Sequence, residues 1–204
     1  FRNSKLQERY FLFEAIYKQK LGEEIKLWEK DAFLLPKKIN GKYILFHRIL
    51  PGIQVIEFDK FKDLTDDYWR QYLKNLSEYI VLNPKYWFES RNVGGGCVPI
   101  ETKDGWLMIY HAVQDTNESK IYHAAAALLD LNDPRKLIAR LKQPLFSPEQ
   151  DWEKQGVVNN VVFPTAAVPE GENLTIYYGA ADKLIGAKSL NINELVEQIK
   201  KDGL

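Results

Sequence analysis

Short apolar runs separated by turn residues dominate the chain from about residue 30 onward. Some runs alternate apolar and polar positions and others are continuously apolar over roughly 4–8 residues, and both patterns are typical of β-strands. The clearest runs after residue 92 are VPIET, WLMIYHAV, YHAAAALLDL, KLIARL, NVVFPTAAV and NLTIYYGAA, with turn residues at Asp133-Pro134, Pro144, Pro148 and Gly171. This pattern predicts an all-β protein.

Helical periodicity is confined to a few segments. Residues 62–82 have Tyr68, Leu76 and Ile80 at helical spacing, and Thr65 followed by two aspartates is a plausible helix start. We therefore expect a helical insertion near 62–82, and a closing helix over 193–200. Residues 5–20 are compatible with either an amphipathic helix or a strand.

One strand pattern recurs along the chain. NGKYILFHR, from Asn40, and DGWLMIYH, from Asp104, each combine a turn dipeptide, an apolar run and a histidine, with Asp104-Gly105 predicting a two-residue hairpin turn. A shift of about 64 residues aligns the two, and a further shift of about 67 reaches NLTIYYGAAD, in which Tyr178 takes the place of His111. Hairpins recurring at a steady period favour propeller blades.

Three units of about 65 residues account for nearly the whole chain. Because β-propellers typically close with about four to eight blades, we expect residues 1–204 to form a single partial propeller domain of about three blades whose N-terminal blades are missing. The alternative is a complete but irregular β-domain.

Composition excludes several functions. The 28 Lys and Arg residues balance the 28 Asp and Glu residues, so the chain has no global field for nucleic acid. No apolar stretch approaches the roughly 18 residues that span a bilayer, so we expect no membrane partner. The lone Cys97 excludes an internal disulfide and a multi-cysteine zinc site. The compartment, cytoplasmic or periplasmic, is left open.

Several of these segments together resemble glycoside hydrolase family 130, the β-mannoside phosphorylases and β-1,2-mannosidases. They are KDAFLLPKKINGKYILFHR, VGGGCVPIETKDGWLMIYHAV, YHAAAALLDLNDPRKLIARLKQPLFSP, NNVVFPTAAV and LTIYYGAAD, within a resemblance that runs from about Lys30 to Glu197. The resemblance implies a five-bladed β-propeller with an axial sugar pocket. It also implies an inverting reaction on a mannoside or manno-oligosaccharide, with an aspartate as proton donor in a segment not found in this chain.

The resemblance also implies a set of pocket residues. Matching the phosphate-binding motifs of the phosphorylases onto this sequence selects Lys30, Asp31, Arg48, Asn92 and His111. Asp182, in GAAD, matches an aspartate that holds a sugar hydroxyl. Arg48, His111 and Asp182 are expected at or just beyond the ends of equivalent strands, and therefore around one axis.

Two departures from the phosphorylase motifs favour hydrolysis. Asp31 replaces an asparagine and Asn92 replaces a lysine, which leaves the set with less positive charge for a phosphate nucleophile. A carboxylate at Asp31 would suit an inverting hydrolase, which needs a base about 6.5–9.5 Å from its acid. We therefore expect an inverting β-mannosidase that acts on β-1,2-linked manno-oligosaccharides, with Asp31 as the hypothetical base that activates water.

Alternatives stay open. The protein could be a phosphorylase using inorganic phosphate as co-substrate, or a non-catalytic carbohydrate-binding fragment. Asp31 could form only an ion pair with Lys30 or Arg48, and Glu89 could be the base instead. His47 and His123 are expected to be structural. We expect no metal and no cofactor. The 62–82 insertion could cover a blade edge or make a homo-oligomer contact, and an N-terminal segment could complement the chain.

Overall fold

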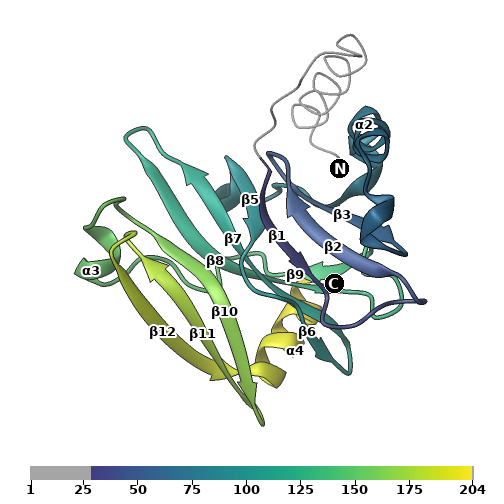
Figure 1. The fold of residues 1–204 in the computed structure, drawn as a ribbon. Helices are drawn as coiled ribbons and strands as arrows, with labels where there is room; N and C mark the ends of the chain where they lie inside the picture. The colour runs from purple at the N-terminus through teal and green to yellow at the C-terminus, as the bar shows by residue number, and fades with distance from the viewer. Residues whose placement is uncertain (1–28, 204) are drawn as a thin grey trace.

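The computed structural model describes residues 29–203, which form three antiparallel sheets in succession along the chain (Figure 1). Helices are few and lie at the periphery or between sheets. The prediction of a mainly β protein with recurring hairpin units is therefore confirmed. The described residues form no closed ring of sheets, so the five-bladed propeller stays a prediction.

The first sheet has the strand order β1-β2-β3-β4. Its strands are β1 (Lys30–Leu34), β2 (Tyr43–Arg48), β3 (Ile53–Phe58) and β4 (Ile80–Leu82). Asn40 and Gly41, with φ angles of 50° and 80°, make the turn between β1 and β2. Both residue types tolerate positive φ, which explains why this dipeptide occupies the turn.

The second sheet has the order β5-β7-β8-β9, with β6 also paired to β7. Its strands are β5 (Asn92–Gly95), β6 (Ile100–Thr102), β7 (Gly105–Asp115), β8 (Lys120–Leu129) and β9 (Leu137–Arg140). The predicted hairpin at Asp104-Gly105 exists, but Thr102 pairs with Gly105, so the two loop residues are Lys103 and Asp104. Gly105 has a positive φ of 154°, but neither Lys103 nor Asp104 has one, so the turn is not of type I′.

The third sheet has the order β10-β11-β12 and leads into a closing helix. The elements are β10 (Val162–Glu170), β11 (Asn173–Ala180), β12 (Leu184–Asn191) and α4 (Ile192–Gly203). Helix α4 begins where the Asn191 side-chain oxygen accepts hydrogen bonds from the backbone N–H groups of Asn193 and Glu194. The closing helix predicted over 193–200 is confirmed and extends further.

The sheets pack face to face, with the second sheet in the middle. Trp106 and Met108 of β7 lie in a buried cluster with residues of the first sheet, whereas Leu107 and Ile109 lie in a cluster with residues of the third. Successive side chains of a strand point to opposite faces. β7 therefore needs apolar residues at every position, which explains its continuously apolar sequence.

The insertion at 62–82 is only partly helical. It consists of η1 (Phe61–Asp63), α2 (Asp66–Lys74) and η2 (Leu76–Tyr79), and its last residues form β4. The prediction of one helix to residue 82 is wrong because Ile80–Leu82 pair with β3 as an edge strand. Tyr72 and Leu76 pack on Ile56 and Phe58, so the insertion covers the outer face of the first sheet. The insertion therefore covers a face of the first sheet, and the homo-oligomer contact stays a prediction.

Before each of the three sheets, a glutamate contacts a ring on a strand of that sheet. Tyr110 donates a hydrogen bond to Glu89 (2.7 Å) and Tyr178 donates one to Glu153 (2.6 Å). In the first sheet, Glu29 Oε1 lies 2.7 Å from His47 Nδ1. Each glutamate precedes the first strand of its sheet, so the contact fixes the chain where it enters that strand. The two remaining short elements carry two of these glutamates: η3 (Trp87–Glu89) and α3 (Asp151–Lys154).

Candidate functional site

Asp31, Arg48 and His111 form a polar cluster between the first and second sheets. Arg48 Nε lies 2.9 Å from Asp31 Oδ2, and His111 Nε2 lies 3.7 Å from the same oxygen. The Asp31 and Arg48 side chains are 13% and 14% exposed, and His111 is 1% exposed. The structure therefore brings together three of the residues predicted from the sequence.

The local backbone explains how Asp31 reaches this position. The pairing of β1 with β2 matches Lys30 to Arg48 and then shifts in register before Phe33, and Asp31 in this irregular stretch has a φ of 56°. Such a bulge re-aims a side chain, and aspartate is among the residues that tolerate positive φ. Sequence patterns do not predict this irregularity, so they left the ion-pair partner of Asp31 open between Lys30 and Arg48, and the structure selects Arg48.

Gly94 allows Asp31 and His111 to approach each other. Gly94 pairs with His111 across β5 and β7, and a Cβ atom on Gly94 would lie less than 3.0 Å from Asp31 Oδ2 and from the His111 ring. Gly95 similarly leaves room for the ring of Phe33. The glycine-rich stretch therefore lets the backbone of β5 pass close to side chains of the first and second sheets.

The third sheet contributes an aromatic ring that the sequence analysis did not select. Phe163 of β10 stacks on His111, with ring centroids 4.3 Å apart and an interplanar angle of 29°. Residues from three sheets thus meet at His111: Asp31 from the first, Gly94 from the second and Phe163 from the third. The repeated histidine and tyrosine positions gave no signal for Phe163, because it lies on a strand without a histidine.

Burial determines the charge states in the cluster. Burial raises the pKa of the Asp31 carboxyl above its ordinary value, although the positive charges of Arg48 and Lys30 act in the opposite direction. Burial lowers the pKa of His111 to about 3, and the charge of Arg48 adds to this effect. His111 is therefore a neutral imidazole near pH 7, able to donate one hydrogen bond and accept another.

Asn92 begins β5 and is 5% exposed. Its side-chain Nδ2 has no hydrogen-bond partner within residues 29–203. A buried amide group without a partner is costly, and one at a candidate site is available for a ligand. Lys30 is exposed, next to Asp31 in the chain.

Asp182 is exposed and lies two residues beyond the end of β11, as predicted. No hydrogen bond or ion pair in the described part of the chain joins it to Asp31, Arg48 or His111. Its neighbour Ala181 donates a backbone hydrogen bond to Val161, just before β10. Its role in the pocket stays a prediction.

Other predictions need correction or are confirmed. Arg48 ends β2 as expected, but His111 does not end its strand, because β7 continues to Asp115 as a long hairpin with β8.

Glu89 is 0% exposed and fully engaged by hydrogen bonds, so it is wrong as a candidate base. His47 and His123 are buried and structural, as expected: His47 contacts Tyr72. His123 contacts Ser147 and Gln114.

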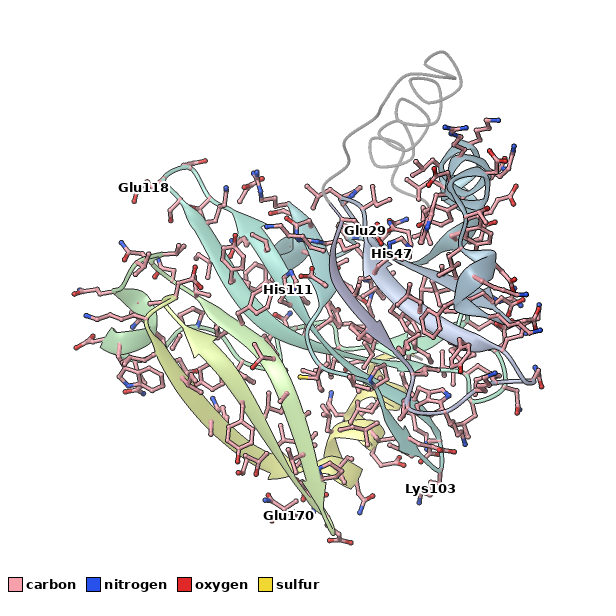
Figure 2. The ribbon with its side chains drawn as sticks, in the orientation of Figure 1. Glu29, His47, Lys103, His111, Glu118 and Glu170 are labelled. Atoms are coloured by element: carbon pink, nitrogen blue, oxygen red, sulfur yellow. The ribbon has the colours of Figure 1, made fainter. Side chains whose placement is uncertain are left out.

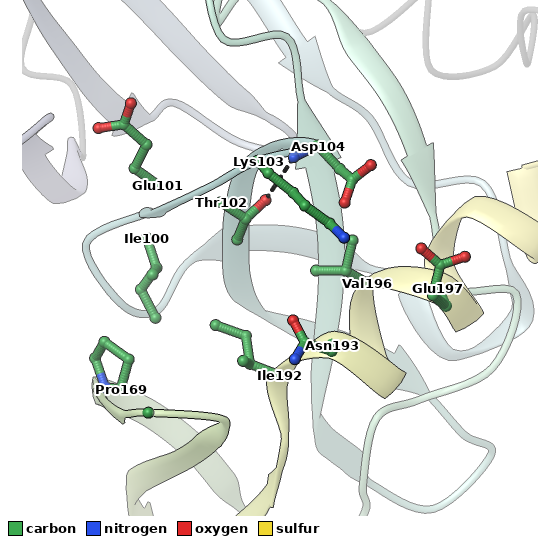
Figure 3. Close-up of a pocket in the computed structure, with 11 residues that line it drawn as sticks. Ile100, Glu101, Thr102, Lys103, Asp104, Pro169, Ile192, Asn193, Val196 and Glu197 are labelled. Atoms are coloured by element: carbon green, nitrogen blue, oxygen red, sulfur yellow. Dashed lines mark hydrogen bonds between the residues drawn. The ribbon is translucent and has the colours of Figure 1, made fainter.

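The candidate site is separate from a cavity that lies at the opposite hairpin ends. Figure 2 shows Glu29, His47 and His111 away from Lys103 and Glu170, which mark the opposite hairpin ends. The cavity, of about 410 Å³, lies at that opposite end, between the β6–β7 hairpin, the β10–β11 hairpin and the start of α4 (Figure 3). Its lining includes none of the predicted site residues, so we do not assign it to the candidate site.

Within residues 29–203, no group of three or more His, Cys, Asp and Glu side chains is placed to hold a metal ion. No helix of this part of the chain has the length and apolarity that crossing a bilayer requires.

Comparison with known proteins identifies the class. The sequence model of glycoside hydrolase family 130, described as beta-1,4-mannooligosaccharide phosphorylase, matches residues 5–201. The chain therefore belongs to glycoside hydrolase family 130. The resemblance seen in the sequence motifs is confirmed.

Individual relatives are named as phosphorylases. The chain is 46% identical over 168 residues to a beta-1,2-mannobiose phosphorylase and 43% identical over 166 residues to a 1,2-beta-oligomannan phosphorylase, both from Thermoanaerobacter sp. (strain X514). Each match covers 81% of this chain, but only 51% and 52% of the relatives. The chain thus spans about half the length of these relatives.

Solved structures agree on the fold. The structure of beta-1,2-mannobiose phosphorylase from Listeria innocua, in complex with beta-1,2-mannobiose, matches with a TM-score of 0.68 and 34% identity. The match covers 85% of this chain and 47% of that protein.

Proposed function

We propose that the protein acts on β-mannosides by phosphorolysis, transferring a mannosyl group to inorganic phosphate. The observation that carries this proposal is the 43% and 46% identity to two proteins named as phosphorylases of β-1,2-linked mannosides. β-1,2-linked manno-oligosaccharides are accordingly the proposed substrates. The hydrolysis expected from the sequence is not supported by these relatives.

The cluster geometry weakens the charge argument for hydrolysis. That argument counted Asp31 as an unpaired carboxylate that would repel phosphate. In the structure the carboxylate lies 2.9 Å from Arg48 Nε, so much of its charge is balanced by the guanidinium that it contacts. We propose that Asp31 orients Arg48, which corresponds to the ion-pair alternative.

Arg48, Asn92 and His111 offer donors for an anion. The Arg48 guanidinium has five N–H groups, and its contact with Asp31 uses the Nε side only. Asn92 Nδ2 has no partner among the described residues, and the neutral His111 can donate one hydrogen bond. Clustered cationic and neutral donors are what binding of phosphate requires. Lys30 adds a positive charge nearby.

The proposed chemistry is a single displacement with inversion. A phosphate oxygen forms a bond to the anomeric carbon of the mannosyl group while the glycosidic C–O bond breaks. The electron pair of that bond goes to the leaving sugar oxygen, which takes a proton from a general acid. We assign this acid to no carboxylate within residues 29–203. The residues named here bind and orient the phosphate.

The proposal predicts that turnover requires phosphate. Incubation of β-1,2-mannobiose with the protein should consume the disaccharide at a rate that rises with phosphate concentration and saturates. Sulfate at equal ionic strength is the control, because it tests for a salt effect. Consumption at an undiminished rate without phosphate would establish a hydrolase instead, and binding without consumption would establish a carbohydrate-binding protein.

The substitution Asp31→Asn distinguishes a general base at Asp31 from a residue that only orients Arg48. Asparagine tolerates the positive φ and keeps an oxygen near Arg48, so we expect kcat to stay within about tenfold of the wild type. Loss of a general base would lower kcat by roughly 10²–10⁴. Steady-state kinetics measure the difference. Asp67→Asn removes an exposed carboxylate 3.4 Å from Arg70 and serves as the matched control. A loss of the larger size for Asp31→Asn alone would restore the base assignment.

A further inference from the structure

Several residues with a left-handed backbone conformation lie close together where β10 begins and β11 ends. In the described residues, positive φ occurs at five non-glycine positions: Asp31, Asn40, Asn160, Ala181 and Asp182. Asn40 is explained by its hairpin turn. Asp31 and Asp182 are predicted site residues, and the remaining two adjoin Asp182 in space or in sequence. Backbone strain of this kind often accumulates at functional sites.

The backbone around Asn160 is tightly fixed. Asn160 N donates to Lys154 O (3.2 Å), and Asn160 O accepts from Tyr122 N of the second sheet (2.9 Å). The residue after it, Val161, accepts from Ala181 N (3.0 Å), which places Asn160 beside the Ala181–Asp182 segment. Asn160 therefore occupies a defined position between the second sheet and the end of β11.

Hydrogen bonds among the described residues do not account for the Asn160 side chain. It is half-buried with a φ of 58°, and its amide makes no hydrogen bond to any residue between 29 and 203. By contrast, the neighbouring Asn159 side chain accepts a hydrogen bond from Gly156 N (3.2 Å). Local hydrogen bonds thus account for the Asn159 side chain and for the Asn160 backbone. They do not account for the side-chain amide of Asn160.

Asn160 and the cluster of Asp31, Arg48 and His111 are close enough to bind the same oligosaccharide. Phe163 stacks on His111 at 4.3 Å and lies three residues after Asn160. Three residues of extended chain span at most about 10 Å, so the two Cα atoms are no further apart than that. Two linked sugar rings are long enough to reach across a distance within this limit.

We propose that Asn160 is a further substrate-binding residue, whose amide hydrogen-bonds hydroxyl groups of the mannoside next to Asp182. The ligand class is a neutral, hydroxyl-rich saccharide, because an amide both donates and accepts, as sugar hydroxyls do. The identity of this saccharide as a β-mannoside rests on the proposed function. Asn160 binds sugar in this assignment and takes no part in phosphate binding, which the first two sheets provide.

Asn160→Gly tests this assignment without disturbing the backbone. Glycine adopts positive φ without steric cost, so the substitution removes the amide alone. Isothermal titration of the protein with β-1,2-mannobiose should give a Kd about 3–10-fold higher than the wild type, as loss of one neutral hydrogen bond implies. The melting temperature and the KM for phosphate should not change. Asn40→Gly, at the other left-handed asparagine, is the matched control and should change none of these values.

Two results would overturn the assignment. One is an unchanged Kd for the disaccharide in Asn160→Gly. The other is a fall in melting temperature of Asn160→Gly that Asn40→Gly lacks, since this would show a structural role for the amide. Because Kd is measured without turnover, failure of the assignment is distinguishable from failure of phosphorolysis, which appears in the wild-type reaction products.

Discussion

Replacing Gly94 with alanine is expected to lower kcat/KM for the mannoside by about 100-fold or more, the effect of displacing a positioned group by roughly 1 Å. The new Cβ would lie less than 3.0 Å from both Asp31 Oδ2 and the His111 ring, so these side chains must separate. The Asp31–Arg48 ion pair depends on the same carboxylate oxygen. Steady-state kinetics with both mannoside and phosphate varied measure the loss.

The matched control for this substitution is Gly179→Ala. Gly179 is also a strand glycine, but the nearest atoms to its added Cβ are 4.0 Å away, an ordinary contact. Overpacking at Gly94 costs about 1–3 kcal/mol of stability, so melting temperatures of both variants must accompany the kinetics. Equal activity in the two variants would show that the arrangement of Asp31 and His111 is not needed for the reaction.

Glu89→Ala is expected to lower the free energy of unfolding by about 3–5 kcal/mol, because it leaves a buried charge without its partner. Glu89 is 0% exposed and accepts hydrogen bonds from Tyr110 (2.7 Å) and from Arg140 Nη1 (3.2 Å), which is itself buried. Its other oxygen accepts from the backbone N–H groups of Lys85 (2.7 Å) and Tyr86 (3.0 Å). Urea unfolding measures the change.

Glu118→Ala is the control, because Glu118 lies exposed in the β7–β8 hairpin and should change stability by less than about 0.5 kcal/mol. Tyr110→Phe removes only one hydroxyl from the network and should cost about 1 kcal/mol. A loss below about 1 kcal/mol for Glu89→Ala would mean that water or rearranged side chains satisfy Arg140 in its absence. The network would then not be what fixes the entry to β5.

The three hairpin units could be predicted from the sequence because apolar runs and turn dipeptides are local signals. The end of the helical insertion could not, since Leu76 and Ile80 fit helical spacing while Ile80–Leu82 also complete the first sheet. Pairing with β3 decides in favour of a strand over a helix for these residues. The length of β7 was underestimated for a similar reason: His111 looked like a strand end, but pairing with β8 extends the strand to Asp115.

The candidate site could also be predicted only in part from the sequence. Motif resemblance selected Asp31, Arg48 and His111, and the structure brings these three together. The structure changes the interpretation of their charge, because a sequence gives formal charges but not which charges are paired. Phe163 and Asn160 could not be selected, since their positions depend on how the third sheet packs against the second.

The most direct test of the central claim is a phosphorus NMR measurement of the products from β-1,2-mannobiose and inorganic phosphate. Phosphorolysis predicts a mannosyl phosphate signal that grows in step with free mannose, one of each for every disaccharide consumed. Mannose as the sole product, with the inorganic phosphate signal unchanged, would contradict the account.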